Sequence, residues 1–321
     1  MRKILLINRG VDTDNIGDVA INQCLTLLFE RANCKVVSAN FTGFFLKKRF
    51  LQFILEAVDK IRKSDLIVIG GGQLFQSNRK FPLSFAIWVF LSFLLRRQVV
   101  VFAAGFDESF TKRDTKLIRM GLRWVSKVYV RDDVSKKSCL VNFGLDVKQI
   151  VDPVFLLGQL VSEKGEAVRS TVLIGIVTYS SIYRYKFMDI SYHEYLDLHA
   201  QYVLDAQNDG LEVFLIYNSQ SDYKQAQDLK EYIHKNYEFS IEIKNCDSLD
   251  TYLDIIRGAK KVISGRLHAL IIAKSLRVQE VVPIIRNQKL ESGQHIVNDF
   301  DMNAYGHLVR IALQDVLSND S

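Results

Sequence analysis

Two hydrophobic patterns alternate along the first half of the chain. Short runs rich in apolar and β-branched residues predict buried strands at residues 3–8, 35–39, 66–70, 99–103 and 128–130. Longer stretches between them have apolar residues at helical spacing, which predicts helices at residues 18–31, 45–63, 83–96, 111–125 and 134–142. Continuous apolar strands separated by helices are typical of a parallel sheet covered on both faces. We therefore expect a doubly wound α/β domain.

The second half repeats this pattern after a more polar connection at residues 159–170. Its predicted strands are residues 172–177, 212–217, 240–243, 262–264 and 281–285. Its predicted helices are residues 192–208, 220–235, 249–256, 268–274 and 304–317. The fold class is therefore α/β, with two Rossmann-like domains at residues 1–160 and 161–321. We expect the domains to face a central cleft, and the final helix could pack back across to the first domain.

Composition narrows the functional classes only slightly. The 321 residues are 48% hydrophobic and 24% charged, as in an average soluble globular protein. The chain has 42 Lys and Arg residues against 36 Asp and Glu residues. Its pairs of adjacent basic residues are scattered along the sequence, which argues against a nucleic-acid partner. The four cysteines are far apart and lack nearby histidines, so neither a zinc site nor a disulfide framework is expected. The N-terminus has no cleavage-site pattern, and we expect a cytoplasmic protein.

One apolar segment, residues 81–95, allows two interpretations. It is almost wholly hydrophobic and is followed by Arg96-Arg97, but it is shorter than the roughly 20 residues that a membrane-spanning helix needs. The first interpretation is a helix buried against the sheet. The second is a helix in a membrane interface, with Trp88 and the two arginines at the level of the lipid headgroups. The second would place the protein at the inner face of the membrane.

Two motifs follow predicted strands of the first domain. Asn15, Gly17 and Asp18 open the first predicted helix, where free backbone N–H groups attract an anion or a sugar hydroxyl and Asp18 can act as the N-cap. Gly71, Gly72 and Gln73 come after the third strand, where a glycine turn permits close approach of a ligand. An ordinary cap and an ordinary tight turn are the alternatives.

Arg131 directly follows the strand at residues 128–130. An arginine at the carboxyl end of a strand can offer its planar fork to a carboxylate or phosphate. A structural salt bridge is the alternative, and Asp132 or Asp133 could simply cap the next helix.

Arg266, Leu267 and His268 lie between a predicted strand and a predicted helix. A cation and an imidazole two residues apart at a helix N-terminus combine anion binding with proton transfer. His268 is thus a candidate general acid, although a lone histidine is often structural.

The order of these motifs resembles the polysaccharide pyruvyltransferase family. The resemblance rests on N-x-G-D near the start, the GGG run, R-D-x-x-S in the middle, Asp152-Pro153 and the late G-R-L-H-A, and it covers nearly the whole chain. Residues 103–107 and 284–289 depart from the family pattern and leave the acceptor sugar, the ketal position and its stereochemistry open.

This resemblance implies a GT-B-like fold and a reaction between phosphoenolpyruvate, as co-substrate, and a glycan that is free or lipid-linked. The product is a pyruvate ketal on a cell-surface polysaccharide or its lipid-linked precursor. Arg131, at the end of a strand of the first domain, would bind phosphoenolpyruvate together with Arg266 and the backbone of Leu267 in the second, donor-side domain. His268 would be the general acid. Asn15, Gly17 and Asp18 would lie on the acceptor side, and Gly71, Gly72 and Gln73 would lie on the acceptor side or in a loop.

Neither a metal nor a separate cofactor is expected. Two other functions stay open at this stage: a GT-B glycosyltransferase that uses a nucleotide sugar, and a non-catalytic interaction protein of a membrane assembly. The oligomeric state is not predicted.

Overall fold

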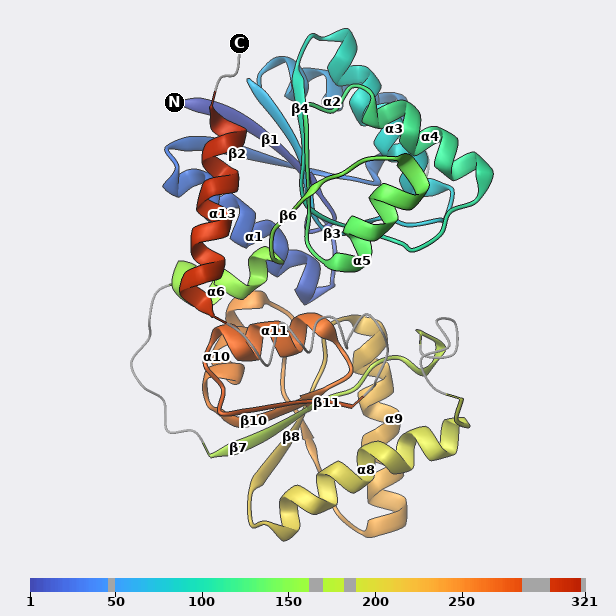
Figure 1. The fold of residues 1–321 in the computed structure, drawn as a ribbon. Coiled ribbons are helices and arrows are strands. Elements are labelled where there is room, and N and C mark those ends of the chain that lie inside the picture. Colours follow the sequence, from blue (N-terminus) through green and yellow to red (C-terminus); the bar gives the residue numbers. More distant parts are fainter. Residues whose placement is uncertain (46–49, 162–169, 182–188, 285–300, 319–321) are drawn as a thin grey trace. The chain divides into compact units, whose positions relative to one another are not determined.

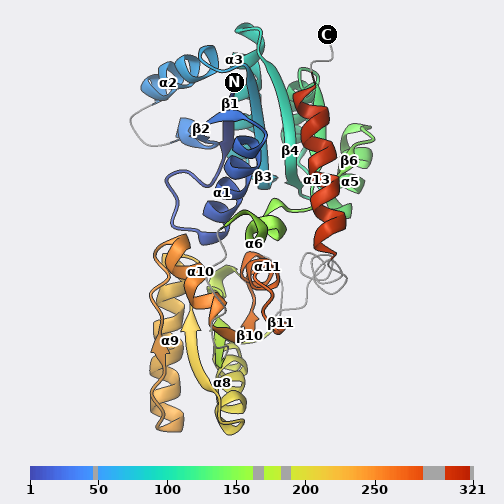
Figure 2. The same ribbon diagram turned by 90° about the vertical axis from the view of Figure 1, so that its left-hand side faces the viewer.

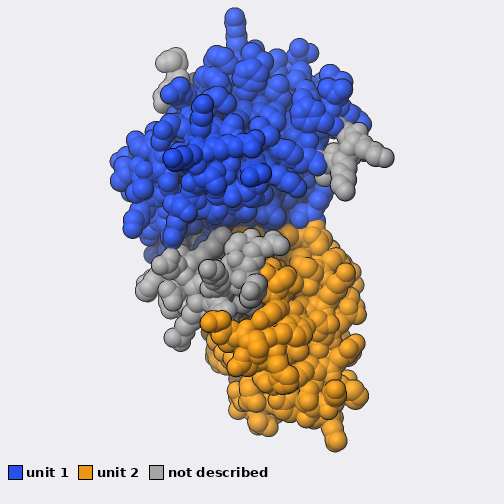
Figure 3. Space-filling model, turned by 90° about the vertical axis from the view of Figure 1, so that its right-hand side faces the viewer, with its two compact units in different colours: residues 1–13, 18–156, 301–321 blue, residues 14–17, 157–300 orange. Residues whose placement is uncertain are grey.

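The structure, a computed structural model, describes residues 1–45, 50–161, 170–181, 189–284 and 301–318. Its contacts divide the chain into two compact units (Figure 3). Unit 1 comprises residues 1–13, 18–156 and 301–321, and unit 2 comprises residues 14–17 and 157–300. The division falls inside the N-x-G-D motif, because Asp14 to Gly17 make their contacts with unit 2.

Unit 1 contains a six-stranded parallel sheet in the order β2-β1-β3-β4-β5-β6 (Figure 1). Its strands are β1 (Arg2–Asn8), β2 (Cys34–Asn40), β3 (Leu66–Phe75), β4 (Gln98–Phe106), β5 (Lys127–Val130) and β6 (Lys148–Gln149). Its helices are α1 (Ile16–Arg31), η1 (Gly43–Phe45), α2 (Phe50–Arg62), α3 (Lys80–Leu94), α4 (Lys112–Leu122), α5 (Asp133–Ser138), η2 (Cys139–Phe143), η3 (Pro153–Leu156) and α13 (Met302–Leu317).

Helices cover both faces of this sheet because its strands are apolar on both sides. Alternate strand residues, among them Ile7, Ile69 and Val101, share one core with α2, α3 and α4. α1 and α13 lie on the other face (Figures 1 and 2). α13 is tied to the sheet by Asp315, which accepts hydrogen bonds from Lys127 at 2.7 Å and Lys148 at 3.0 Å. These bonds lower the pKa of the Asp315 carboxyl.

Unit 2 contains a five-stranded parallel sheet in the order β11-β10-β7-β8-β9. Its strands are β7 (Thr171–Gly175), β8 (Glu212–Ile216), β9 (Glu242–Ile243), β10 (Ala259–Ser264) and β11 (Glu280–Pro283). Its helices are α6 (Leu157–Leu160), α8 (Tyr192–Asn208), α9 (Gln220–Tyr237), α10 (Leu249–Arg257) and α11 (Leu267–Ser275). α8 and α9 pack side by side on one face, and α10 and α11 lie on the other (Figure 2).

The predicted α/β class with two parallel sheets is confirmed, but the predicted turn at the glycine run is wrong. Gly71 and Gly72 lie inside β3 with φ of 75° and 76°, and the strand continues to Phe75 along β4. A Cβ at Gly71 would lie 2.1 Å from a side-chain carbon of Ile21. The glycines therefore allow α1 to pack closely on the strand.

The apolar segment forms α3, which packs on the sheet. Trp88 is fully buried, and its indole N–H donates to the carbonyl oxygen of Phe41 at 3.1 Å. The predicted alternative of Trp88 at headgroup level is therefore wrong, because this side chain belongs to the core. None of the helices within the described ranges is long and apolar enough to span a bilayer.

Candidate functional site

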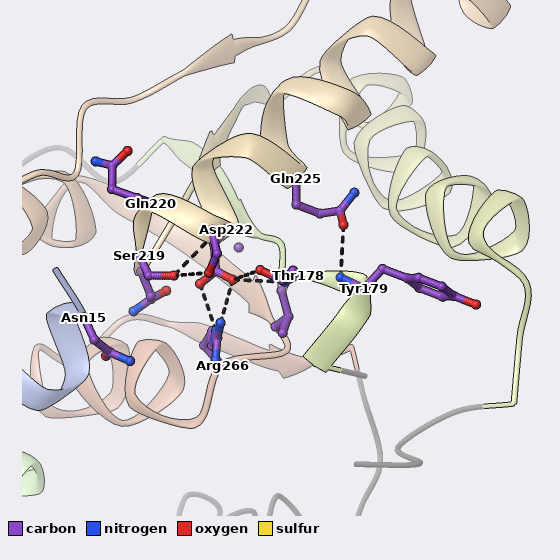
Figure 4. A network of polar contacts seen from close by, with 12 residues as sticks. Asn15, Thr178, Tyr179, Ser219, Gln220, Asp222, Gln225 and Arg266 are labelled. Atoms are coloured by element: carbon purple, nitrogen blue, oxygen red, sulfur yellow. Dashed lines mark hydrogen bonds and ion pairs between the residues drawn. The ribbon is translucent and has the colours of Figure 1, made fainter. Parts of the chain in front are cut away.

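Arg266 is positioned by the end of β10 and the start of α11. Its guanidinium forms a two-point contact with Asp222, with Nε at 2.9 Å from Oδ2 and Nη2 at 2.6 Å from Oδ1 (Figure 4). The side chain of Arg266 is 27% exposed, whereas that of Asp222 is 0% exposed. The fork is thus fixed from its buried side while part of the cation reaches solvent.

Asp222 lies in the first turn of α9, whose N-cap is Ser219. Its Oδ1 also accepts hydrogen bonds from the backbone N–H and the hydroxyl of Thr178, both at 3.0 Å (Figure 4). A buried carboxylate is costly unless its oxygens are bonded. Here one carboxylate joins α9, Arg266 and the chain that follows β7, so it fixes the direction of the arginine.

A second set of bonds holds the neighbouring chain segments. Gln225 accepts a hydrogen bond from the backbone N–H of Tyr179 at 3.0 Å (Figure 4). It also donates to the hydroxyl of Tyr192 at 2.8 Å. The backbone N–H of Gln220 donates to Asp14 at 2.8 Å. These bonds stabilise segments at the carboxyl ends of β7 and β8, where ligands bind in open α/β sheets.

His268 lies in the first turn of α11 against Gly17. A Cβ at Gly17 would lie only 2.5 Å from Nδ1 of His268, so no larger residue fits there without a shift. The structure therefore brings two of the predicted motifs together in unit 2. No side chain caps α11, whose N-cap residue is Arg266. The first amides of this helix favour an anion.

Asn15 and Asp18 have different local roles. The side chain of Asn15 accepts a hydrogen bond from the N–H of Gly17 at 3.0 Å, and the N–H of Ile16 donates to the carbonyl oxygen of Asn218 at 2.9 Å. The predicted N-cap at Asp18 is wrong, because α1 begins at Ile16 and Asn15 makes the capping contact. Asp18, in unit 1, is 8% exposed and lies 3.3 Å from Arg9.

Arg131 lies in unit 1 directly after β5 and is 4% exposed. Its Nη1 donates to Asp152 at 2.8 Å and its Nη2 donates to Gln73 at 3.0 Å. Gln73 in turn donates to Asp107 at 2.9 Å. A Cβ at Gly105 would lie 2.9 Å from Nε of Arg131, so this glycine makes room for the guanidinium. The arrangement is the structural salt bridge that the sequence left as an alternative.

The rest of the R-D-x-x-S motif also has local partners. Asp132 is the N-cap of α5 and accepts from the N–H of Ser135 at 2.7 Å. The hydroxyl of Ser135 accepts from the N–H of Phe106 at 2.8 Å. This motif therefore ties α5 to β4.

Asp222 was not among the predicted site residues. Its only sequence signal is an acidic residue in the first turn of a helix after Ser219, and that signal normally indicates a cap. Its partner Arg266 is 44 residues away, so the pair appears only in the fold.

Not every histidine of unit 2 suits proton transfer. His199 is fully buried in α8, and its Nδ1 donates to the carbonyl oxygen of Tyr195 at 2.8 Å. Burial lowers the pKa of His199 to about 4, so this ring is neutral near pH 7. His199 is therefore a core residue.

Within the described parts of the chain, no cluster of three or more His, Cys, Asp or Glu side chains could hold a metal ion. The candidate site consists of Arg266, the start of α11 and His268 in unit 2.

Comparisons with known proteins give one family and one fold. A family model described as polysaccharide pyruvyl transferase matches residues 15–279. A comparison with curated protein sequences gives no match.

Among solved structures, the chain is similar to UDP-GlcNAc 2-epimerase from Methanocaldococcus jannaschii. The TM-score is 0.54 at 13% identity, over 98% of this chain and 99% of that one. It also matches the E. coli heptosyltransferase WaaC with a TM-score of 0.47 at 9% identity, over 97% and 99% of the two chains. The likeness to the epimerase confirms the predicted GT-B-like class of two Rossmann-like domains.

Proposed function

Since this chain belongs to the polysaccharide pyruvyl transferase family, we propose that it transfers pyruvate from phosphoenolpyruvate to a sugar of a cell-surface polysaccharide or its lipid-linked precursor. The product is a pyruvate ketal. The observation that carries the proposal is the family match over residues 15–279, which includes Arg266 and His268.

The donor would bind at the start of α11. Arg266 is held by Asp222 and keeps part of its guanidinium exposed, which suits a bidentate contact with a carboxylate or phosphate. The backbone N–H of Leu267 and the positive end of the helix add to the attraction for an anion. That Arg131 is a second donor ligand stays a prediction.

His268 would act as the general acid. The terminal methylene of phosphoenolpyruvate is nucleophilic because the enol oxygen donates electrons to it, and it takes a proton from the imidazolium to become a methyl group. One acceptor hydroxyl then adds to the resulting cationic carbon. A second hydroxyl displaces phosphate and closes the ketal, and the two hydroxyl protons pass to phosphate and back to the imidazole. General acid catalysis of this kind contributes about 10²–10⁴-fold.

The acceptor would approach the same imidazole from the side of the N-x-G-D motif. Gly17 packs directly against the ring of His268, and Asn15 is two residues away in the cap of α1. Neither residue presents an apolar side chain, which suits a sugar rich in hydroxyls.

Because no metal is required for these steps, we expect turnover to persist in the presence of a chelator.

A GT-B glycosyltransferase that uses a nucleotide sugar is the competing proposal, since its fold would be the same. The two differ in their donor. We expect phosphoenolpyruvate to raise the melting temperature in a thermal-shift experiment, whereas UDP- and GDP-sugars leave it unchanged. Stabilisation by a nucleotide sugar and none by phosphoenolpyruvate would overturn the proposal.

A further inference from the structure

The outward face of α3 is apolar, which is unusual for a surface helix. Trp88, Phe85 and Val89 point into the core, while Phe90, Phe93 and Leu94 are 45%, 50% and 58% exposed. After Lys80 the helix has no charged residue. A surface helix of a soluble protein normally carries polar residues on its outer side, so the core of unit 1 does not explain this composition.

α2 extends the apolar surface. It packs against α3 on the same face of the sheet (Figure 1). Phe50, Leu51 and Leu55 of α2 are 48%, 76% and 70% exposed. Single exposed apolar residues are ordinary, but a group on neighbouring helices indicates an interaction surface. The charges of α2 balance, with Glu56 and Asp59 against Lys60 and Arg62.

α4 packs against the other side of α3 and is strongly basic. Lys112, Arg113, Lys116 and Arg119 of the helix and Arg123 at its C-cap are all exposed. The only acidic residue of α4, Asp114, is fully buried and accepts a hydrogen bond from Ser77 at 3.0 Å. Four of the five cations, with Phe110 and Met120, line a hollow of ≈ 590 Å³. This surface therefore carries positive charge without an exposed carboxylate on the same helix.

We propose that the joint outer surface of α2, α3 and α4, here called the α3 face, docks on a membrane that contains anionic lipids. The apolar side chains would enter the boundary between headgroups and acyl chains, and the cations of α4 would contact lipid phosphates. Charge complementarity favours this occupant over a second copy of the chain, because a symmetric dimer through this face would oppose five cations to five. The contact would be peripheral, and it is independent of the proposed reaction.

Vesicle co-sedimentation of the full chain tests this inference. We expect binding to vesicles of phosphatidylcholine with phosphatidylglycerol, little binding to phosphatidylcholine alone, and a decrease with added salt. Lys112→Glu with Lys116→Glu should weaken binding at least about tenfold, since each cation near an anionic surface contributes measurably. Phe90→Gln with Leu94→Gln should weaken it as well.

Two matched control pairs keep the test specific. Leu308→Gln with Ile311→Gln changes exposed apolar residues of α13, on the opposite face of the sheet, and should bind as the unaltered protein does. Lys230→Glu with Lys235→Glu makes the same charge change on α9 of unit 2 and should weaken binding less than the α4 pair. Thermal melts check that each variant is folded.

Three results would overturn the inference. These are no binding to anionic vesicles, equal loss in the α4 and α9 pairs, or a dimer in sedimentation velocity that Phe90→Gln with Leu94→Gln dissociates. The last result would make the α3 face a surface for self-association.

Discussion

Arg131 of unit 1 and Arg266 of unit 2 have the same sequence signal and different surroundings. Each follows the carboxyl end of a parallel strand, and each is bound to a buried carboxylate, Asp152 or Asp222. Arg131 is 4% exposed, and both of its terminal nitrogens donate hydrogen bonds to protein side chains. The side chain of Arg266 is 27% exposed and is bound by the carboxylate of Asp222. The buried Arg131 is therefore suited to hold the fold, and the partly exposed Arg266 is suited to bind an anion.

The largest expected effect is on stability at position 131. Arg131→Met would leave Asp152 buried without its counter-ion, which costs roughly 3–5 kcal/mol of unfolding free energy. For a unit of this size the melting temperature should fall by roughly 10 °C. Arg266→Met should cost clearly less, since Asp222 keeps its two bonds from Thr178 and water can reach the vacated position. Equal losses in thermal melts would remove the distinction between the two arginines.

Next in size is the effect of His268→Asn. Loss of the general acid should lower kcat for phosphate release by about 10²–10⁴-fold. Phosphoenolpyruvate affinity by calorimetry should change little, because Arg266 is intact. His193→Asn is a matched control on α8, with a side chain that is 72% exposed, and should leave kcat unchanged. An unaltered kcat in the His268 variant would exclude this residue as the acid.

Arg266→Lys should weaken phosphoenolpyruvate binding by about 10–10²-fold, because a point charge cannot replace a planar fork. Arg131→Lys should weaken it less, since this guanidinium is occupied by Asp152 and Gln73. Dissociation constants from calorimetry on both folded variants rank the two positions. A greater loss at position 131 would make Arg131 the principal donor ligand and reverse the comparison.

The smallest effect is expected from Asp222→Asn. The amide keeps an acceptor for Thr178 but removes the charge that fixes Arg266, so donor affinity should fall by a few-fold to about tenfold. This role is positioning, and kcat at saturating donor should be retained. Asp228→Asn on the same helix, which neutralises the carboxylate that accepts from the Tyr192 hydroxyl at 2.7 Å, serves as the control. If both variants bind alike, Asp222 has no specific effect on Arg266.

Much of the fold could be predicted from the sequence because strand and helix patterns are local. The strands near Ile7, Ile69 and Val101 were expected, and they form the core of unit 1. The sequence predicts a turn at the glycine run because it does not show that Ile21 of α1 packs against Gly71. The need for glycine at this position comes from close packing between segments that are distant in the sequence.

The candidate site was predictable only as a set of residue types. Arg266 and His268 were identified from their neighbours in the chain, but the partner Asp222 and the contact between His268 and Gly17 depend on the tertiary fold. The burial of Arg131 likewise depends on Asp152, 21 residues away. Sequence can place charged side chains at strand ends, whereas their exposure is decided by packing.

The most direct test of the account follows the donor carbon into product. The full chain is incubated in D2O with phosphoenolpyruvate labelled at its methylene carbon and a panel of free and lipid-linked glycans, and phosphate release and glycan mass are measured. We predict one phosphate for each labelled ketal, with one deuterium in its methyl group, and formation of both products about 10²–10⁴-fold slower with His268→Asn. Transfer of a sugar from a nucleotide donor, with no phosphate release or label transfer from phosphoenolpyruvate, would contradict the account.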